Sequence, residues 1–134
     1  MSLSQQQRFP RRRASVGAAR DFTTRTLTDW GLDDLQDELR LCVSELATNA
    51  LIHGAPPGRE FSVRLDVDGS LVRLEVRDSG EGLPVVRDPD ADEETGRGLR
   101  LAMTLADECG VIEHVVGKSV WLNFKLRREL EGTG

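Results

Sequence analysis

Hydrophobic residues recur at two different spacings along the chain, and the change of spacing separates helical parts from extended parts. Apolar side chains return every three or four residues over 15–30 and again over 33–54, which predicts two amphipathic helices. After the second helix the period becomes two. Apolar positions alternate with polar ones over 61–67 and 72–76, with an Asp-Gly pair between them, so these residues are expected to form an antiparallel hairpin with one buried face.

Residues with strong conformational preferences mark the boundaries of these elements. A short extended segment is expected at 8–10, before the first helix, and Gly31 ends that helix. Asp33, followed three residues later by Gln36, matches a capping box at the start of the second helix. Gly54 and the two prolines after it end the second helix, since proline cannot continue a helix.

The second half of the chain predicts one more helix and two more strands. Residues 84–95 contain two prolines and an acidic cluster without a period, so they are expected to form a loop. A helix over 98–108 and strands over 111–116 and 120–126 follow. This order of elements predicts an α+β fold, a two-layer sandwich with the helices on one face of a mostly antiparallel sheet. We expect a single domain, with its core at about 8–126 and flexible ends.

Composition narrows the class of protein. The chain has 134 residues, 31% of them charged, and a net charge of -5, which disfavours a general nucleic-acid binder because such proteins need a cationic surface. No apolar run approaches the roughly 20 residues that span a bilayer, and 1–7 lacks the apolar core of a secretory signal. We therefore expect a cytoplasmic protein without a membrane segment. Cys42 and Cys109 lack the spacing of a metal site, and both are expected to be buried.

The end of the second helix carries the first candidate chemistry. Glu45, Asn49 and His53 are four residues apart, so they share one stripe of the helix. The carbonyl oxygen of an asparagine suits Mg²⁺, and a carboxylate one turn away can take a proton from a hydroxyl group. Such a pair alone usually belongs to a solvated helix face, and His53 also fits a favourable interaction with the helix dipole.

Two further segments place glycines where a ligand needs close access to the backbone. Asp78 ends a strand and is followed by Gly80 and Gly82, and a buried carboxylate there would accept a hydrogen bond from the amino group of adenine. Gly96 and Gly98 lie at the start of a helix, where free N–H groups bind anions. Read singly, these segments are an ordinary turn and an ordinary helix start. The chain has neither a Walker P-loop nor the dinucleotide-binding fingerprint.

Taken together, the three segments resemble the N, G1 and G2 boxes of the GHKL (Bergerat-fold) ATPases. Within that superfamily, the segments 43–54 and 117–122 are most similar to the small anti-sigma-factor serine kinases of the RsbW type and to single-domain ATP-binding regulators of actinobacteria. The resemblance covers roughly 8–126. It implies ATP and Mg²⁺ as cofactors and roles for particular residues: Glu45 as general base; Asn49 as magnesium ligand; Asp78 as the adenine contact, supported by Ser119 through water; Gly80 and Gly82 in the base pocket; Gly96, Arg97, Gly98 and Leu99 at the phosphates, with His53 as a further candidate there.

The same resemblance implies a protein serine/threonine kinase that binds a sigma factor and phosphorylates a serine of a STAS-type anti-anti-sigma protein. Nucleic acid and membranes are not expected as partners, whereas a homodimer is, by analogy. The alternative is a regulatory module that binds ATP and a partner without turnover. A histidine kinase would need a phosphoacceptor histidine in a dimerisation domain, and no histidine precedes residue 33. A gyrase-like or MutL-like machine would need a transducer domain, which we do not expect.

Overall fold

The computed structural model describes residues 2–54, 60–78, 101–115 and 117–126, which form helices packed on one sheet. Residues 101–105 are also helical. In chain order, the elements are β1 (Ser2–Pro10), α1 (Ala14–Asp29), the short 3-10 turn η1 (Asp33–Leu35), α2 (Gln36–Asn49), the π-helical turn η2 (Ala50–Gly54), β2 (Glu60–Asp68), β3 (Leu71–Asp78), β4 (Glu108–Glu113) and β5 (Lys118–Lys125).

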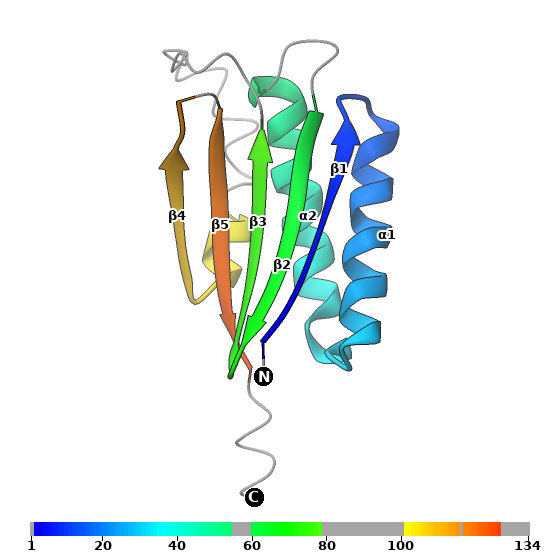
Figure 1. The fold of residues 1–134 in the computed structure, drawn as a ribbon, viewed down its shortest axis with the longest axis vertical. Helices are drawn as coiled ribbons and strands as arrows, with labels where there is room; N and C mark the ends of the chain where they lie inside the picture. The colour runs from blue at the N-terminus through cyan, green and yellow to red at the C-terminus, as the bar shows by residue number, and fades with distance from the viewer. Residues whose placement is uncertain (1, 55–59, 79–100, 116, 127–134) are drawn as a thin grey trace, which may run out of the picture.

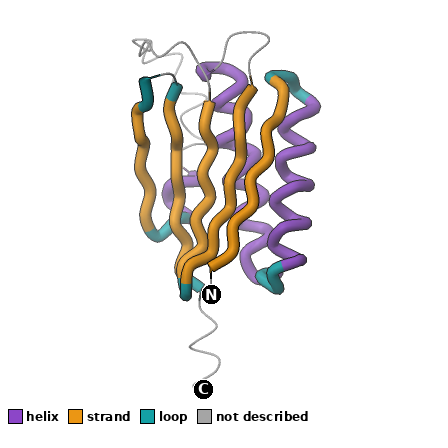
Figure 2. The backbone as a smooth tube through the Cα atoms, viewed as in Figure 1, coloured by secondary structure: helices purple, strands orange, loops and turns teal. Residues whose placement is uncertain are grey.

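The strands form one five-stranded sheet in the order β1-β2-β3-β5-β4, and every neighbouring pair is antiparallel. Both α1 and α2 lie on the same face of this sheet (Figures 1 and 2). This arrangement confirms the predicted α+β sandwich. It follows from the patterns, because strands with one apolar face and helices with one apolar stripe bury both surfaces by packing against each other.

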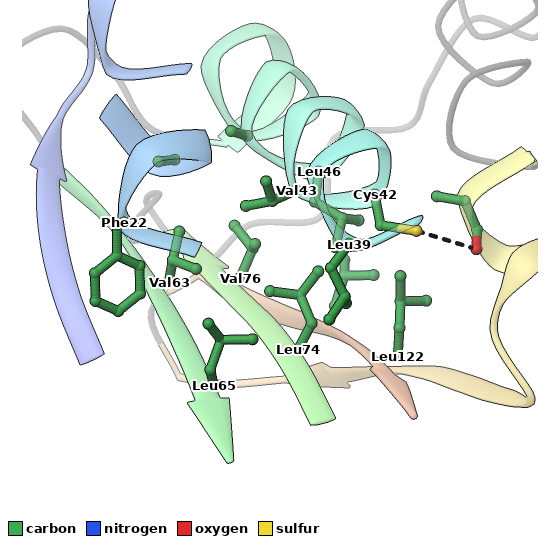
Figure 3. Close-up of a cluster of buried hydrophobic side chains, with 14 of the residues drawn as sticks. Phe22, Leu39, Cys42, Val43, Leu46, Val63, Leu65, Leu74, Val76 and Leu122 are labelled. Atoms are coloured by element: carbon green, nitrogen blue, oxygen red, sulfur yellow. Dashed lines mark hydrogen bonds between the residues drawn. The ribbon is translucent and has the colours of Figure 1, made fainter. Parts of the chain in front are cut away.

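The core lies between the helices and the central strands. Leu65, Leu74 and Leu122 face one another across β2, β3 and β5, and all three are fully buried. Side chains from α2 point toward this row (Figure 3). The alternation predicted for 61–67 and 72–76 is confirmed, since the odd-numbered positions of β2 and the even-numbered positions of β3 are buried. Gly69 takes a positive φ of 63° in the turn between them.

The helix α1 matches its predicted range, the helix predicted over 33–54 is divided into η1, α2 and η2, and the predicted capping box is wrong. Gly31, with a φ of 72°, follows α1 as expected. At the start of α2, residues 33–35 form a 3-10 turn and no side chain caps the helix. Nε2 of Gln36 lies within hydrogen-bond distance of the Thr24 backbone oxygen, the Thr28 hydroxyl and, at 3.4 Å, Oδ1 of Asp33, so Gln36 bonds to α1 and to the Asp33 side chain rather than to a backbone N–H. Within the described residues, no helix is both long and apolar enough to cross a membrane.

The start of the chain is more ordered than its side-chain pattern suggested. Residues 2–7 were expected to be flexible, yet β1 pairs with β2 from Ser2 to Pro10. Within β1 only Phe9 is buried, and the polar run 5–7 is exposed. The strand is therefore stabilised chiefly by backbone hydrogen bonds to β2, and such pairing leaves no hydrophobic period to detect in the sequence.

The other sheet edge also differs from prediction. The strand expected at 111–116 is β4, which begins earlier, at Glu108, so the preceding helix cannot reach that residue. Cys109 is exposed, which corrects the expectation that it is buried, because β4 is an edge strand that pairs with β5 alone. Cys42 is buried as expected, and its thiol donates to the backbone oxygen of Ala102 at 3.7 Å (Figure 3).

Candidate functional site

The last turn of α2 places a carboxylate and a carboxamide beside the core. The apolar stripe of α2 runs through Leu39, Val43 and Leu46, all buried, and Asn49 ends the helix with 7% of its surface exposed. Glu45, one turn earlier, is half-buried. The chain then widens into the π-helical turn η2, a feature that often occurs at functional sites. The predicted stripe of Glu45 and Asn49 therefore lies on regular helix at the edge of the core.

The end of β3 places a second carboxylate at the edge of the core. Asp78 follows Val72, Leu74 and Val76 on the buried side of β3, and it is only 5% exposed. The backbone N–H of Lys118 donates to its Oδ1 at 3.3 Å. A buried carboxylate needs such hydrogen bonds to offset its loss of hydration. This bond also restricts the orientation of the carboxylate.

The turn between β4 and β5 packs directly against Asp78. Gly117 has a φ of 80°, and a Cβ atom there would collide with the backbone oxygen of Asp78 and would lie 2.9 Å from its Oδ1. Only glycine permits this approach. Sequence reasoning included Gly117 in the segment 117–122 but did not identify it as a contact of Asp78, because the contact joins residues far apart in the chain.

Glu45, Asn49 and Asp78 come from elements that meet at one end of the sandwich. Both α2 and η2 contact β3, and the end of α2, the end of β3 and the start of β5 lie at the top in Figure 1. These three side chains are two carboxylates and one carboxamide. In the described parts of the chain, no group of three acidic, histidine or cysteine side chains could hold a metal ion. This finding is compatible with Mg²⁺, which takes few protein ligands when it binds substrate phosphates.

Ser119 occupies an unexpected environment. It is fully buried, and its hydroxyl lies 2.8 Å from Nε2 of His114. It pairs with Arg77, whereas the next residue, Val120, pairs with Val76. Because successive residues of a strand face opposite sides, Val120 shares the helix-covered side with Asp78, and Ser119 faces away from it. The predicted support of the adenine contact by Ser119 remains a prediction.

Sequence reasoning gave no role to His114. Its imidazole contacts Ser119, and its backbone N–H donates to the Gly117 oxygen at 3.0 Å. A histidine five residues before a serine, across a Gly-containing turn, was the only sequence signal for this pair.

Several predicted residues lie outside the described part of the chain. The loop predicted at 84–95 and the candidate base-pocket and phosphate-binding residues belong to this group, and so does the side chain of His53, whose backbone is in η2. Their roles remain predictions. The undescribed candidates are Gly80, Gly82, Gly96, Arg97, Gly98 and Leu99.

Two carboxylates of α2, those of Glu38 and Glu45, act on the buried thiol of Cys42. Burial, with smaller contributions from the negative charges of Glu38 and Glu45, raises the pKa of the Cys42 thiol to about 12. Cys42 is therefore a neutral thiol at physiological pH. A neutral buried thiol is a poor nucleophile, so Cys42 belongs to the core rather than to the reacting groups.

Comparison with known proteins agrees with this geometry. Residues 9–124 match the family model of the histidine kinase-like ATPase domain. The anti-sigma F factor of Geobacillus kaustophilus is 32% identical over 108 residues, which cover 70% of this chain and 73% of the relative. The anti-sigma F factor of Bacillus cereus is also 32% identical, over 124 residues that cover 84% of this chain and 79% of the relative.

Solved structures show the same fold. The RsbU and RsbW domains of a Mycobacterium tuberculosis protein superpose with a TM-score of 0.71 at 19% identity, over 92% of this chain and 32% of that one. A blue-light activated histidine kinase of Erythrobacter litoralis gives a TM-score of 0.59 at 26% identity, over 74% of this chain and 33% of that one. The chain thus spans about a third of each of these solved chains. The fold, the position of the polar ends of α2 and β3, and the match over 9–124 together show that the chain belongs to the histidine kinase-like ATPase family.

Proposed function

We propose that this protein is an ATP- and Mg²⁺-dependent serine/threonine protein kinase of the anti-sigma-factor type. The observation that carries the proposal is the pair of buried polar side chains, Asn49 and Asp78, at the adjoining ends of α2 and β3. The names of the two anti-sigma F factors, each of which this chain matches over more than two thirds of its length, support the same function.

The end of β3 fits the base of ATP. Asp78 is a buried acceptor, and Oδ1 already receives one N–H from the backbone of Lys118. A carboxylate has several acceptor sites, so it can also accept a hydrogen bond from the exocyclic amine of adenine. Guanine would present an oxygen at that place, and two facing acceptors would repel. Asp78 is therefore the residue that would select adenine.

The end of α2 fits the metal and the reacting hydroxyl. Asn49 would hold Mg²⁺ through its side-chain oxygen, and Gly96, Arg97, Gly98 and Leu99 would hold the phosphates. ATP supplies the phosphoryl group for transfer. Glu45, half-buried one turn before Asn49, would accept the proton of the substrate serine hydroxyl.

Glu45 could accept a proton from any hydroxyl group, and the similarity to anti-sigma F factors is what supports a protein substrate. We propose a STAS-type anti-anti-sigma protein as the phosphoacceptor and a sigma factor as the protein that this chain sequesters. A regulator that binds ATP and a sigma factor without transfer would use the same Asp78 and Asn49, but it would not need Glu45.

Phosphate transfer to a STAS-domain protein tests the proposal. The purified chain is incubated with Mg²⁺, γ-labelled ATP and a STAS-domain protein from the same organism, and label on serine is measured over time. Glu45→Gln is the test variant. Glu38→Gln is a matched control, because Glu38 lies seven residues earlier on the same side of α2, about 10 Å farther from its end, and both carboxylates act on the Cys42 thiol.

We expect labelled serine with the wild type and with Glu38→Gln, and a rate at least about a hundredfold lower with Glu45→Gln, as is typical when a general base is removed. ATP binding without transfer to any STAS-domain protein of the organism would support the regulatory module instead. Equal rates for Glu45→Gln and wild type would remove Glu45 from the mechanism.

A further inference from the structure

On one side of the β4–β5 turn, a partly buried hydrogen bond joins two side chains across the turn. Ser119 is fully buried at the start of β5, and its Oγ lies 2.8 Å from Nε2 of His114, which follows β4. Either the hydroxyl donates to Nε2 or an Nε2–H group donates to Oγ, according to the tautomer. Within the same turn, the His114 N–H donates to the Gly117 oxygen. Through these two bonds, His114 on one side of the turn is joined to Gly117 and Ser119 on the other side.

The other side of the same turn contacts the carboxylate that would select adenine. The Lys118 N–H donates to Oδ1 of Asp78 at 3.3 Å, and Gly117 approaches the Asp78 backbone more closely than any other residue type could. Lys118 lies between Gly117 and Ser119 in the chain, so a shift of the turn moves its N–H group relative to the carboxylate. At 3.3 Å this bond is long, and a small shift would break it.

Two of the described residues of the turn contribute little side-chain packing to fixing it. Val115, at its tip, is 95% exposed, and Gly117 has no side chain. Loops with few buried contacts open at low free-energy cost, unless hydrogen bonds hold them. His114 and Ser119 supply such a bond on the face of the sheet opposite to Asp78.

We propose that His114 and Ser119 are positioning residues for adenine recognition: their hydrogen bond holds the β4–β5 turn so that the Lys118 N–H orients the Asp78 carboxylate toward the base. This inference rests on the proposed binding of ATP. It extends that proposal to two residues that would not touch the nucleotide, and it assigns to Ser119 a role through His114 rather than through water at the base.

The test compares the affinities for ATP and GTP in single and double variants. The Kd values of Mg·ATP and Mg·GTP are measured by calorimetry, or by competition where binding is weak, for the wild type, His114→Ala, Ser119→Ala and the double variant. Thermal unfolding of each variant is recorded in parallel. Val115→Ala is the matched control in the same turn, and His114→Gln tests rescue, since a glutamine amide can reach the position of Nε2.

We expect each single alanine variant to weaken ATP binding about fivefold, the net effect of one hydrogen bond, while the affinity for GTP stays within about twofold. The double variant should resemble the single ones, because both remove the same bond. Val115→Ala should bind ATP as the wild type does, and His114→Gln should recover most of the lost affinity.

Two results would overturn the inference in different ways. If the wild type binds ATP but the alanine variants retain its affinity and its preference for adenine, His114 and Ser119 have no positioning role. The same conclusion follows if affinity for GTP falls as much as affinity for ATP, since a general loss of structure explains that result. If the wild type itself does not bind ATP, the proposed function fails first, and the inference fails with it.

Discussion

The middle and the end of the sandwich use the same two elements in different ways. In the middle, α2 and β3 bury apolar side chains such as Leu46 and Val76, whereas the last buried positions of these elements hold Asn49 and Asp78. The middle therefore stabilises the fold, and the end keeps polar groups at a cost in stability. Packing restricts the side chains there, and the low polarity around them strengthens discrimination between hydrogen-bonding partners.

The largest effect on stability is expected in the middle. Leu74 is fully buried in the central row of the sheet, so Leu74→Ala should lower the free energy of unfolding by about 3 kcal/mol, through lost burial and the cavity that remains. Urea denaturation measures this loss. The folded variant should bind ATP as the wild type does. A large loss of ATP affinity in fully folded Leu74→Ala would mean that the middle and the end are not separable.

At the end of the sandwich, the largest effect should fall on binding. Asp78→Asn keeps the shape of the side chain but replaces an acceptor oxygen by a donor group, so ATP affinity should fall about a hundredfold, or about 2.7 kcal/mol, with little change in stability. Calorimetry measures both ATP and GTP. Asp68→Asn, an exposed carboxylate at the other end of the sheet, serves as the control. Unchanged ATP binding by Asp78→Asn would refute the adenine contact.

A substitution at Gly117 should change both the stability of the fold and the binding of ATP. Gly117→Ala should destabilise the fold by about 2 kcal/mol, because the new Cβ strains a positive φ and collides with the Asp78 backbone, and it should also weaken ATP binding. Gly69→Ala isolates the first cause, since Gly69 also has a positive φ but its Cβ would meet nothing within 4 Å. We expect only about 1 kcal/mol there. Equal losses for both variants would show that the collision has no energetic effect.

The labelling rates of the two thiols should differ even in the unmodified protein. At pH 8 a disulfide-exchange reagent should label exposed Cys109 quickly and buried Cys42 only as the fold opens. Since folding raises the pKa of the Cys42 thiol from 9.0 to about 12, its contribution to the free energy of unfolding should be constant below pH 9 and should decline as the pH rises toward 12. Fast labelling of Cys42, seen as a fast reaction of both thiols in the wild type and of the one remaining thiol in Cys109→Ser, would contradict the burial of Cys42 in the core.

Prediction from sequence worked best where side-chain burial decides the structure. The hairpin β2–β3 and the helix α1 were predicted to within one or two residues, because each shows its buried face as a period. The predicted helix over 33–54 was found with its ends as the turns η1 and η2 around α2. Prediction failed at the edges. Most of β1 is exposed and held through its backbone, and β4 exposes Cys109 because only one neighbour pairs with it. The capping box failed because residues 33–35 form a 3-10 turn and α2 begins only at Gln36.

In the candidate site, too, some features follow from local sequence patterns and others only from packing between distant segments. The chain by itself determined that Glu45 and Asn49 share a helix stripe and that Asp78 ends a buried strand, because helix and strand periodicity act over a few residues. Only the tertiary structure decided that α2 and β3 end together, that Gly117 packs on Asp78, and that Ser119 bonds with His114 rather than facing Asp78. These contacts depend on sheet order and strand register, which arise from packing between segments far apart in the chain and leave no local pattern in the sequence.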